Sequence, residues 1–136
     1  MTWSVSTASG RTPTSRRFSK RFRLPDILEL QRVLDEAVRA GRITEDEKYD
    51  LLLADLLVQG RHGDEEAYWV VEVSARVGPH DVERAARRAG LLSRATGVPA
   101  LAAVAGRRLA SDAVEAEAHA RGVWRVLDRL ALPPNK

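Results

Sequence analysis

The sequence contains no cysteine, which excludes disulfide bonds and metal sites built on thiolate ligands. It has no apolar run near the roughly 20 residues that a membrane-spanning helix needs, and its basic N-terminus lacks the apolar core of a secretory signal. Aromatic residues make up only 5% of the 136 residues, beside 44% hydrophobic and 30% charged residues. We therefore expect a single globular domain in the cytoplasm, with no membrane partner.

Lysine is also scarce, because it occurs only at positions 20, 48 and 136, so that 19 of the 22 basic residues are arginine. Few lysines are therefore candidates for catalysis. The charge is unevenly distributed, since residues 1–24 carry six basic residues and no acid, whereas the rest of the chain carries 16 basic and 19 acidic residues. The net charge of +3 is thus the sum of +6 in the first segment and −3 in the remainder.

Residues 1–24 are interpreted as a basic tail with interspersed aromatic residues. Such a segment binds phosphate backbones through its cations and stacks bases on its aromatic rings. The candidate nucleic-acid contacts in it are Arg16, Arg17, Lys20 and Arg21. In the alternative interpretation the segment is a solvated extension, rich in Ser, Thr and Gly, that binds nothing.

A single α/β domain is expected at residues 25–132, followed by a short tail at 133–136. Periodicity, capping residues and turn glycines predict its elements. They are, in chain order, helices at 26–40 and 44–52, strands at 54–60 and 67–76, a helix at 82–95 capped by Asp81, a strand at 98–105, a helix from Ser111 to about 121, and a strand at 123–127. The alternation after the second strand predicts parallel pairing.

The two neighbouring strands are joined by a two-residue turn that contains Gly63. This turn pairs His62 with Glu65, so that partners sum to 127 and Asp55 lies opposite Glu72. Directly opposed residues share one face, with Cβ atoms about 4.5–5.5 Å apart. Because both faces of this hairpin are mainly apolar, we expect it in the centre of a sheet flanked by helices.

Two carboxylates that meet within apolar strands require a cation or a proton between them, because like charges repel and desolvation is costly. Mg²⁺ or Mn²⁺ accepts such oxygen ligands, and a bound metal polarises a phosphodiester and generates hydroxide. Asp55 and Glu72 are therefore candidate metal ligands. In the alternative interpretation Asp55 merely starts a strand near its exposed end, and Glu72 pairs with an arginine in a half-buried bridge.

Asp55, a gap of hairpin length and Glu72-Val73-Ser74 resemble the motif of the PD-(D/E)XK nuclease superfamily. The order of predicted elements over residues 26–127 is similar as well. More narrowly, the motif together with Asp81–Ala85 and Arg87–Ala89 resembles a set of uncharacterised bacterial nuclease-like domains. The resemblance implies a restriction-endonuclease-like fold and a divalent-metal-dependent nuclease that acts on nucleic acid.

The chain departs from this motif at Ser74, which stands where the family has a catalytic lysine that positions water and stabilises negative charge. Arg76, two residues further on the same face, is a candidate replacement, although arginine stays protonated and shuttles protons poorly. The family also takes a glutamate from its first helix, for which Glu29 and Glu36 are candidates without motif support. The resemblance thus implies a catalytic set of Asp55, Glu72, Ser74 and Arg76.

Two further arginine groups leave alternatives open. Arg84, Arg87 and Arg88 form either a phosphate-contacting face or an ordinary solvated face of the predicted helix, and Gly106-Arg107-Arg108 either meets an anion or is a polar loop. We expect a metal-dependent nuclease or nuclease-derived domain with DNA or RNA as its partner. The alternative is a catalytically inactive module for nucleic-acid binding or protein assembly, and homodimerisation and a larger complex stay open.

Overall fold

The computed structural model describes residues 23–128 and 130–134, which form a mixed α/β domain. Arg16, Arg17, Lys20 and Arg21 lie outside the described residues. The helices, in chain order, are α2 (Ile27–Arg39), α3 (Glu45–Leu52), α4 (Pro79–Thr96) and α5 (Asp112–Arg121). The strands are β1 (Leu56–His62), β2 (Glu65–Val73), β3 (Arg76–Val77), β4 (Ala100–Gly106), β5 (Arg108–Leu109), β6 (Val123–Leu127) and β7 (Leu130–Leu132).

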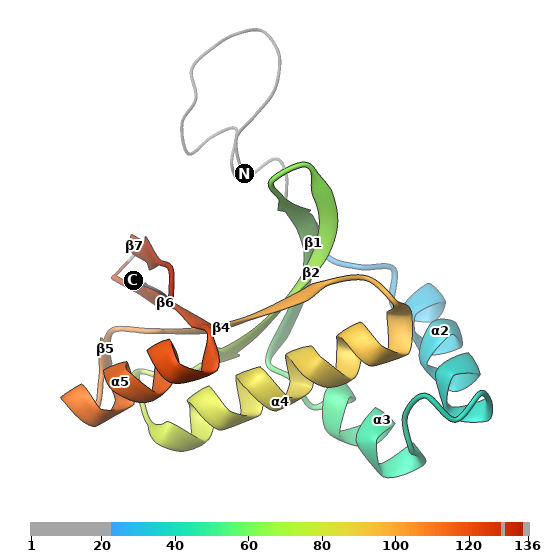
Figure 1. The fold of residues 1–136 in the computed structure, drawn as a ribbon, viewed down its shortest axis with the longest axis horizontal. Coiled ribbons are helices and arrows are strands. Elements are labelled where there is room, and N and C mark those ends of the chain that lie inside the picture. Colours follow the sequence, from blue (N-terminus) through green and yellow to red (C-terminus); the bar gives the residue numbers. More distant parts are fainter. Residues whose placement is uncertain (1–22, 129, 135–136) are drawn as a thin grey trace, which may run out of the picture.

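Within this described part, five strands form one sheet in the order β1-β2-β4-β6-β7, while β3 and β5 pair in a separate two-stranded sheet. The outer pairs β1–β2 and β6–β7 are antiparallel, and the inner pairs β2–β4 and β4–β6 are parallel. Figure 1 shows α2, α3, α4 and α5 on one side of the five-stranded sheet. The described domain is therefore a layer of helices against a layer of strands.

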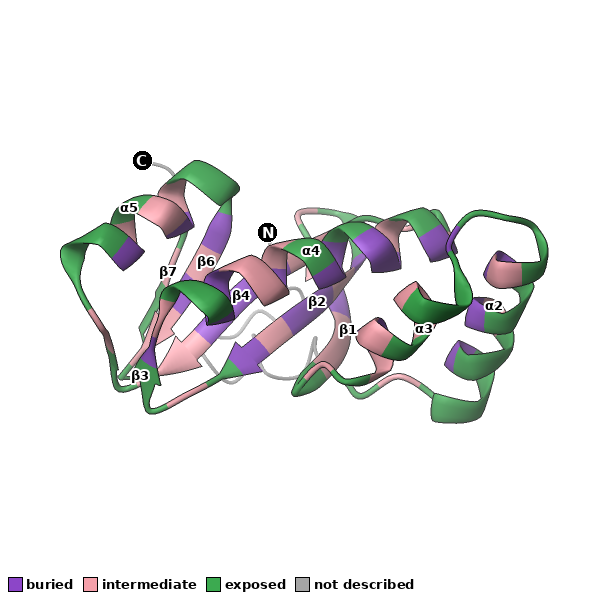
Figure 2. Cartoon of the chain, turned by 90° about the horizontal axis from the view of Figure 1, so that it is seen from below, coloured by how far each residue is buried: buried purple, intermediate pink, exposed green. Residues whose placement is uncertain are grey.

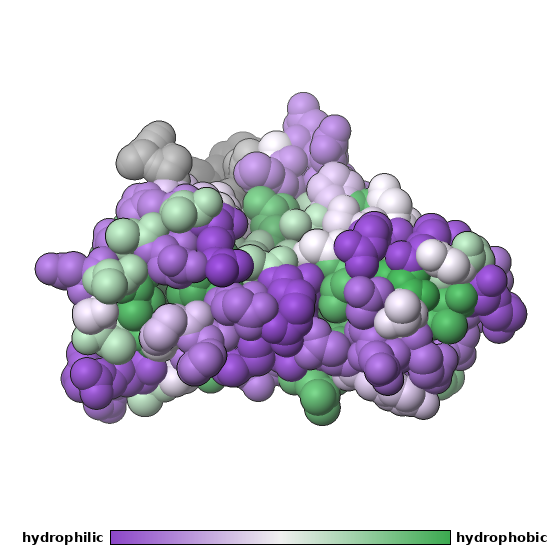
Figure 3. Space-filling model, turned by 60° about the horizontal axis from the view of Figure 1, so that its bottom comes forward, coloured by the Kyte–Doolittle hydropathy of each residue, from purple (hydrophilic) through white to green (hydrophobic). Residues whose placement is uncertain are grey.

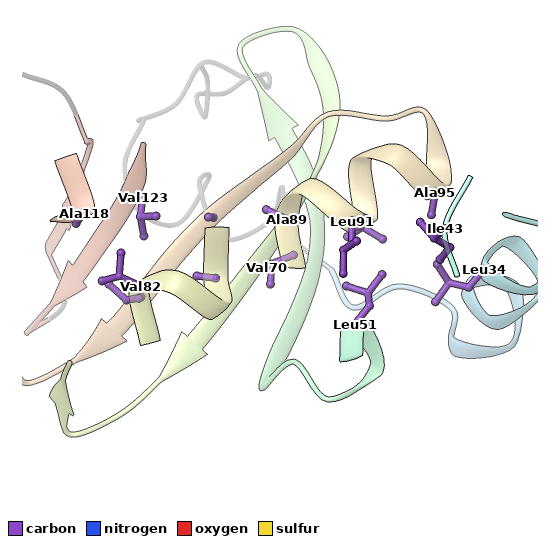
Figure 4. Close-up of a cluster of buried hydrophobic side chains, with 14 of the residues drawn as sticks. Leu34, Ile43, Leu51, Val70, Val82, Ala89, Leu91, Ala95, Ala118 and Val123 are labelled. Atoms are coloured by element: carbon purple, nitrogen blue, oxygen red, sulfur yellow. The ribbon is translucent and has the colours of Figure 1, made fainter. Parts of the chain in front are cut away.

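The main hydrophobic core lies between these two layers. Figure 4 shows Val70 of β2 and Val123 of β6 on the side of the sheet that carries Val82 and Ala89 of α4. Figure 2 shows buried residues along the central strands β2, β4 and β6 behind α4. Since α4 crosses all three of these strands, it is the helix whose position decides which side chains of the sheet are enclosed.

The opposite side of the sheet is also apolar. Side chains alternate along β2, so that Val70 faces the helices and Trp69 lies on the other side. The Trp69 ring packs edge-on against Trp124 of β6 with 5.2 Å between centroids, and the His62 ring contacts both at 6.3 and 6.4 Å. These three rings stabilise a face of the sheet against which the described helices do not pack.

The predicted pairing register is confirmed. The ladder between β1 and β2 runs from His62 opposite Glu65 to Leu56 opposite Val71, so that partners sum to 127 as the two-residue turn requires. The parallel pairing of the later strands is confirmed too, as are the helices that begin near 26, 44 and 111. The length of the turn fixes the register of a hairpin. A shift by one residue would exchange its two faces.

Four expectations about the elements differ from the structure. The hairpin strands span Leu56–His62 and Glu65–Val73 instead of 54–60 and 67–76, and the hairpin lies at one end of the sheet order, not in its centre. Helix α4 begins at Pro79 with Gly78 as its N-cap, and Asp81 accepts a hydrogen bond from the Gly78 N–H at 2.9 Å from inside the first turn. The short strands β3, β5 and β7 were not predicted, since two or three residues carry no readable periodicity.

Gly106 permits the close crossing of two backbone segments beyond the ends of β2 and β4. A Cβ atom at this position would overlap the carbonyl oxygen of Ser74 and lie 3.0 Å from Cγ2 of Val77. Next to it, the Arg107 N–H donates to the carbonyl of Ala75 at 3.0 Å. The absence of a side chain at 106 is therefore what lets β5 reach β3.

We predict that Gly106→Ala destabilises the domain by about 1–3 kcal/mol or more, because the added methyl group must displace backbone rather than a flexible side chain. Chemical denaturation measures this change. Gly90→Ala is the matched control, since Gly90 lies exposed in α4 with nothing near its added Cβ and should gain about 0.5–1 kcal/mol. Equal effects of the two substitutions would contradict the role given to Gly106.

Candidate functional site

Asp55 lies in the bend directly before β1 and is exposed. Its Oδ2 atom accepts a hydrogen bond from the backbone N–H of Val73 at 2.8 Å. The register of the hairpin continues to this point, so that Asp55 lies opposite Glu72 beyond the last ladder pair. The sequence prediction that the two acids are neighbours across the hairpin agrees with this geometry. One oxygen of Asp55, however, accepts a hydrogen bond from the backbone of β2.

Glu72 has a very different environment. It lies on the helix-facing side of β2 and is only 1% exposed. Its Oε2 atom lies 3.0 Å from Nη1 of Arg88, and its Oε1 atom lies 3.4 Å from Nε of Arg84. Both arginines come from α4, so that both oxygens of the buried carboxylate face guanidinium groups. Such pairing offsets the cost of removing the charge from water.

The pairing extends into a network between three elements. Nη2 of Arg88 lies 3.0 Å from Oδ1 of Asp50 on α3. Nε of Arg87 lies 2.9 Å from Oδ2 of the same aspartate. Arg87 further pairs with Glu83, and Arg84 pairs with Asp81 at 2.6 Å. Acids and arginines alternate along this network in the order Asp81, Arg84, Glu72, Arg88, Asp50, Arg87 and Glu83.

The three arginines of α4 that we predicted as phosphate contacts are all engaged in this network. Arg88 is buried, and Arg84 and Arg87 each pair with two acids. A signal for this arrangement was present in the sequence, because Arg88 falls on the same helical stripe as the buried residues Ala85 and Leu92. Asp50 carried no comparable signal, since it sits near the end of a short helix with little apolar periodicity.

The pairing perturbs the protonation of its more accessible members. The guanidinium of Arg87, assisted by Arg88, lowers the pKa of the Asp50 carboxyl below its ordinary value, although partial burial opposes the shift. In return, the hydrogen bonds that Arg87 donates to Asp50 and Glu83 raise the pKa of Arg87. Both shifts favour the charged forms of Asp50 and Arg87.

Asp55 and Glu72, the predicted metal ligands, are both engaged with other groups of the described chain. Both oxygens of Glu72 face arginine, and Asp55 is held by a backbone N–H instead of by a second carboxylate. Across residues 23–128 and 130–134, no group of three or more His, Asp or Glu side chains is placed to hold a metal ion. The geometry is that of the alternative interpretation, with Glu72 more deeply buried than a half-buried bridge.

The other predicted site residues lie apart from this network. The Ser74 hydroxyl donates to the carbonyl oxygen of Arg76 at 3.1 Å, and the Arg76 side chain is exposed. Glu29 and Glu36 lie on exposed turns of α2, where they pair with arginines of the same helix. Glu29 and Glu36 are therefore paired within α2, and among the described residues Arg76 makes no salt bridge with Glu72.

An apolar pocket of about 250 Å³ lies beside Asp55. It is lined by Leu24, Pro25, Ile27, Leu30, Leu52, Ala54, Asp55, Leu56 and Leu57, so that Asp55 is the one charged group among its described lining residues. Figure 3 shows hydrophobic side chains gathered at the end of the helical face where α2 and α3 lie. Asp55 is thus the polar edge of a mainly apolar pocket.

Four of the described arginines make neither a salt bridge nor a side-chain hydrogen bond within the described chain. They are Arg23, Arg76, Arg107 and Arg108. The last three belong to the segments that meet at the β3–β5 sheet. Three of the four arginines without a side-chain partner among the described residues thus lie in neighbouring segments.

Comparisons with known proteins leave the fold class at the level of a mixed α/β domain. No family model matches the chain, and neither the curated proteins nor the solved structures include a significant match to it. Among the described residues, none of the helices combines the length and the apolar character required to cross a bilayer.

We predict that Arg88→Met destabilises the domain by about 3–5 kcal/mol, because it leaves the Glu72 carboxylate buried without its nearest partner. The double variant Glu72→Gln/Arg88→Met should recover much of this loss, since it removes both charges. Free energies of unfolding from urea titration provide the measurement. Arg39→Met is the control, because Arg39 pairs with Glu36 on an exposed face and should change little. Additive effects of the two substitutions would contradict a buried ion pair.

A pH dependence follows from Asp50. Because its folded-state pKa is lowered, its contribution is fully present above the unfolded-state pKa of about 3.9 and is lost as the pH falls through the folded value. The stability difference between the wild type and Asp50→Asn should therefore shrink below about pH 4. Denaturant unfolding between pH 2.5 and 7 gives the curve, with exposed Asp64→Asn as the control. A difference that stays constant with pH would refute this assignment.

Proposed function

We propose that this protein is a nucleic-acid-binding module of restriction-endonuclease-like architecture that does not cleave its ligand. The observation that carries the proposal is the pairing of Glu72, whose two oxygens face Arg88 and Arg84 at 3.0 and 3.4 Å. A carboxylate held in this way would have to lose its arginine partners before it could coordinate a metal ion. The replacement of the motif lysine by Ser74 supports the same conclusion, because serine supplies no positive charge.

The distribution of charge supports nucleic acid as the ligand. Residues 1–24 carry six basic residues and no acid, and this surplus is not matched in the rest of the chain. Sequence-independent attraction to nucleic acid depends on such cations, because each neutralised phosphate releases counterions. The binding would accordingly be strong at low salt and weak at high salt.

A metal-dependent nuclease is the second candidate, and the hairpin register favours it. Asp55 lies opposite Glu72, and Asp55 is exposed. For this function, Arg88 and Arg84 would have to release Glu72 when a metal ion and substrate bind. Asp55 and Glu72 would then hold Mg²⁺ or Mn²⁺, and the metal would supply an activated water.

We predict that the full chain binds mixed-sequence DNA or RNA oligonucleotides, with an affinity that falls steeply with salt. Replacing Arg16, Arg17, Lys20 and Arg21 by Gln should reduce the slope of log K against log salt by about 2.8–3.6, since each phosphate contact contributes about 0.7–0.9. Fluorescence anisotropy at several salt concentrations measures both values. Failure to bind any oligonucleotide at low salt would rule the proposal out.

The same oligonucleotides distinguish the two candidates when they are incubated with Mg²⁺ or Mn²⁺. The proposed module leaves them intact, and its variant Asp55→Ala, at an exposed position, binds them as well as the wild type. Metal-dependent cleavage that Asp55→Ala and Glu72→Ala both abolish, and that the exposed control Asp64→Ala retains, would establish the nuclease instead. Denaturing gel electrophoresis of end-labelled substrate provides the readout.

A further inference from the structure

We infer that Arg76, Arg107 and Arg108, here called the arginine cluster, form a binding site for backbone phosphate groups of nucleic acid. This inference rests on the proposed function and assigns to it a place within the folded domain. The cluster lies on the β3–β5 sheet, beyond the ends of β2 and β4. It is separate from the network around Glu72, whose arginines are already paired with acids.

The register of β3 and β5 places two positive charges side by side. Arg76 lies directly beside Arg108 in the parallel pair, while the next residues are also partners, Val77 beside Leu109. Val77 is fully buried and Leu109 packs against the core, so Arg76 and Arg108 occupy the outward face together. Neighbouring strands are about 4.8 Å apart, and like charges placed directly opposite each other destabilise a sheet.

Among the described residues this pair forms no salt bridge, although Asp112 and Asp128 lie in neighbouring segments. None of the three arginines lies within salt-bridge distance of a described acid, although most described arginines do. The nearest acid along α4 that follows β3 is Asp81, and its oxygens are taken by Arg84 and the Gly78 N–H. Asp128 approaches from the other side, where its backbone N–H donates to the Gly106 carbonyl at 3.3 Å. An external anion is therefore the group that would relieve the repulsion.

The backbone beneath the cluster is held firmly. The Ser74 N–H donates to the Ala105 carbonyl at 2.9 Å, the Arg107 N–H to Ala75 at 3.0 Å, and the Ala110 N–H to Val77 at 2.8 Å. The close crossing at Gly106 fixes the two segments against each other. A site on a rigid frame loses little entropy when it binds, which favours a preformed anion site over a mobile loop.

The position and the side chains together indicate the class of ligand. Ligands of sheets with parallel strands commonly bind outside the carboxyl ends of those strands, and both β2 and β4 end here. Guanidinium groups bind phosphate through paired N–H donors, and three of them suit adjacent phosphates of a nucleic-acid backbone. Contacts of this kind position a ligand without reading its sequence. We therefore assign to the cluster a contribution to affinity and none to base specificity.

The test compares Arg76→Gln/Arg108→Gln with the control Arg32→Gln/Arg39→Gln, which removes two charges from exposed pairs on α2. In oligonucleotide binding at low salt, the cluster variant should lose at least about tenfold in affinity, and its salt slope should fall by about 1.4–1.8. The control should stay within about twofold of the wild type. Unchanged melting temperatures exclude unfolding as the cause.

The outcomes separate this inference from the proposed function. If the wild type binds nucleic acid and the cluster variant binds equally well, the assignment of the site is overturned and the proposed function stands. If the wild type binds no nucleic acid, the proposed function is wrong. A titration with inorganic pyrophosphate then tests whether the cluster binds anions. Amide NMR shifts confined to residues 75–78 and 106–109, and lost in the cluster variant, would retain an anion site there. Their absence would overturn it.

Discussion

The ion pair between Glu72 and Arg88 is the interaction on which the arrangement of the described domain depends. It places a carboxylate of the sheet and a guanidinium of α4 in the same buried region, where neither charge is tolerable alone. Arg88 also reaches Asp50, so the pair joins β2, α4 and α3 at one point. Hydrophobic contacts such as those of Val70 carry no direction, whereas these ion pairs connect particular atoms of α4 with β2 and α3.

The sequence determined local geometry better than layer arrangement. A two-residue turn specified the hairpin register down to the residue, and the capping box at Thr44 and the glycine at 122 specified helix ends. The central position of the hairpin was wrong because apolar residues on both faces were taken to mean helices on both faces. The second apolar face instead carries Trp69 and Trp124, whose rings pack on each other. Periodicity reports that a face is apolar, and it does not report what covers it.

At the candidate site, too, the local geometry could be predicted from the sequence, but the partner of the buried charge could not. Sequence reasoning found that Asp55 and Glu72 are neighbours and that buried like charges require a positive group. It could not decide whether this group is a metal ion or a guanidinium, because the answer depends on where α4 packs. With 19 arginines in the chain, a guanidinium partner was available. The stripe that contains Ala85, Arg88 and Leu92 held the relevant information, since it turns an arginine toward the sheet.

The same electrostatic rule leads to opposite conclusions at two places near the C-terminal end of β2. At Glu72, the fold itself supplies the compensating charge, and a further cation would have to displace Arg88 and Arg84. At Arg76 and Arg108, two like charges are held on neighbouring strands. Most described arginines are paired within the fold, whereas these two lie side by side without a salt bridge. An anion bound there would reduce their mutual repulsion. For this reason we place ligand binding at the β3–β5 sheet, and not between the acids of the hairpin.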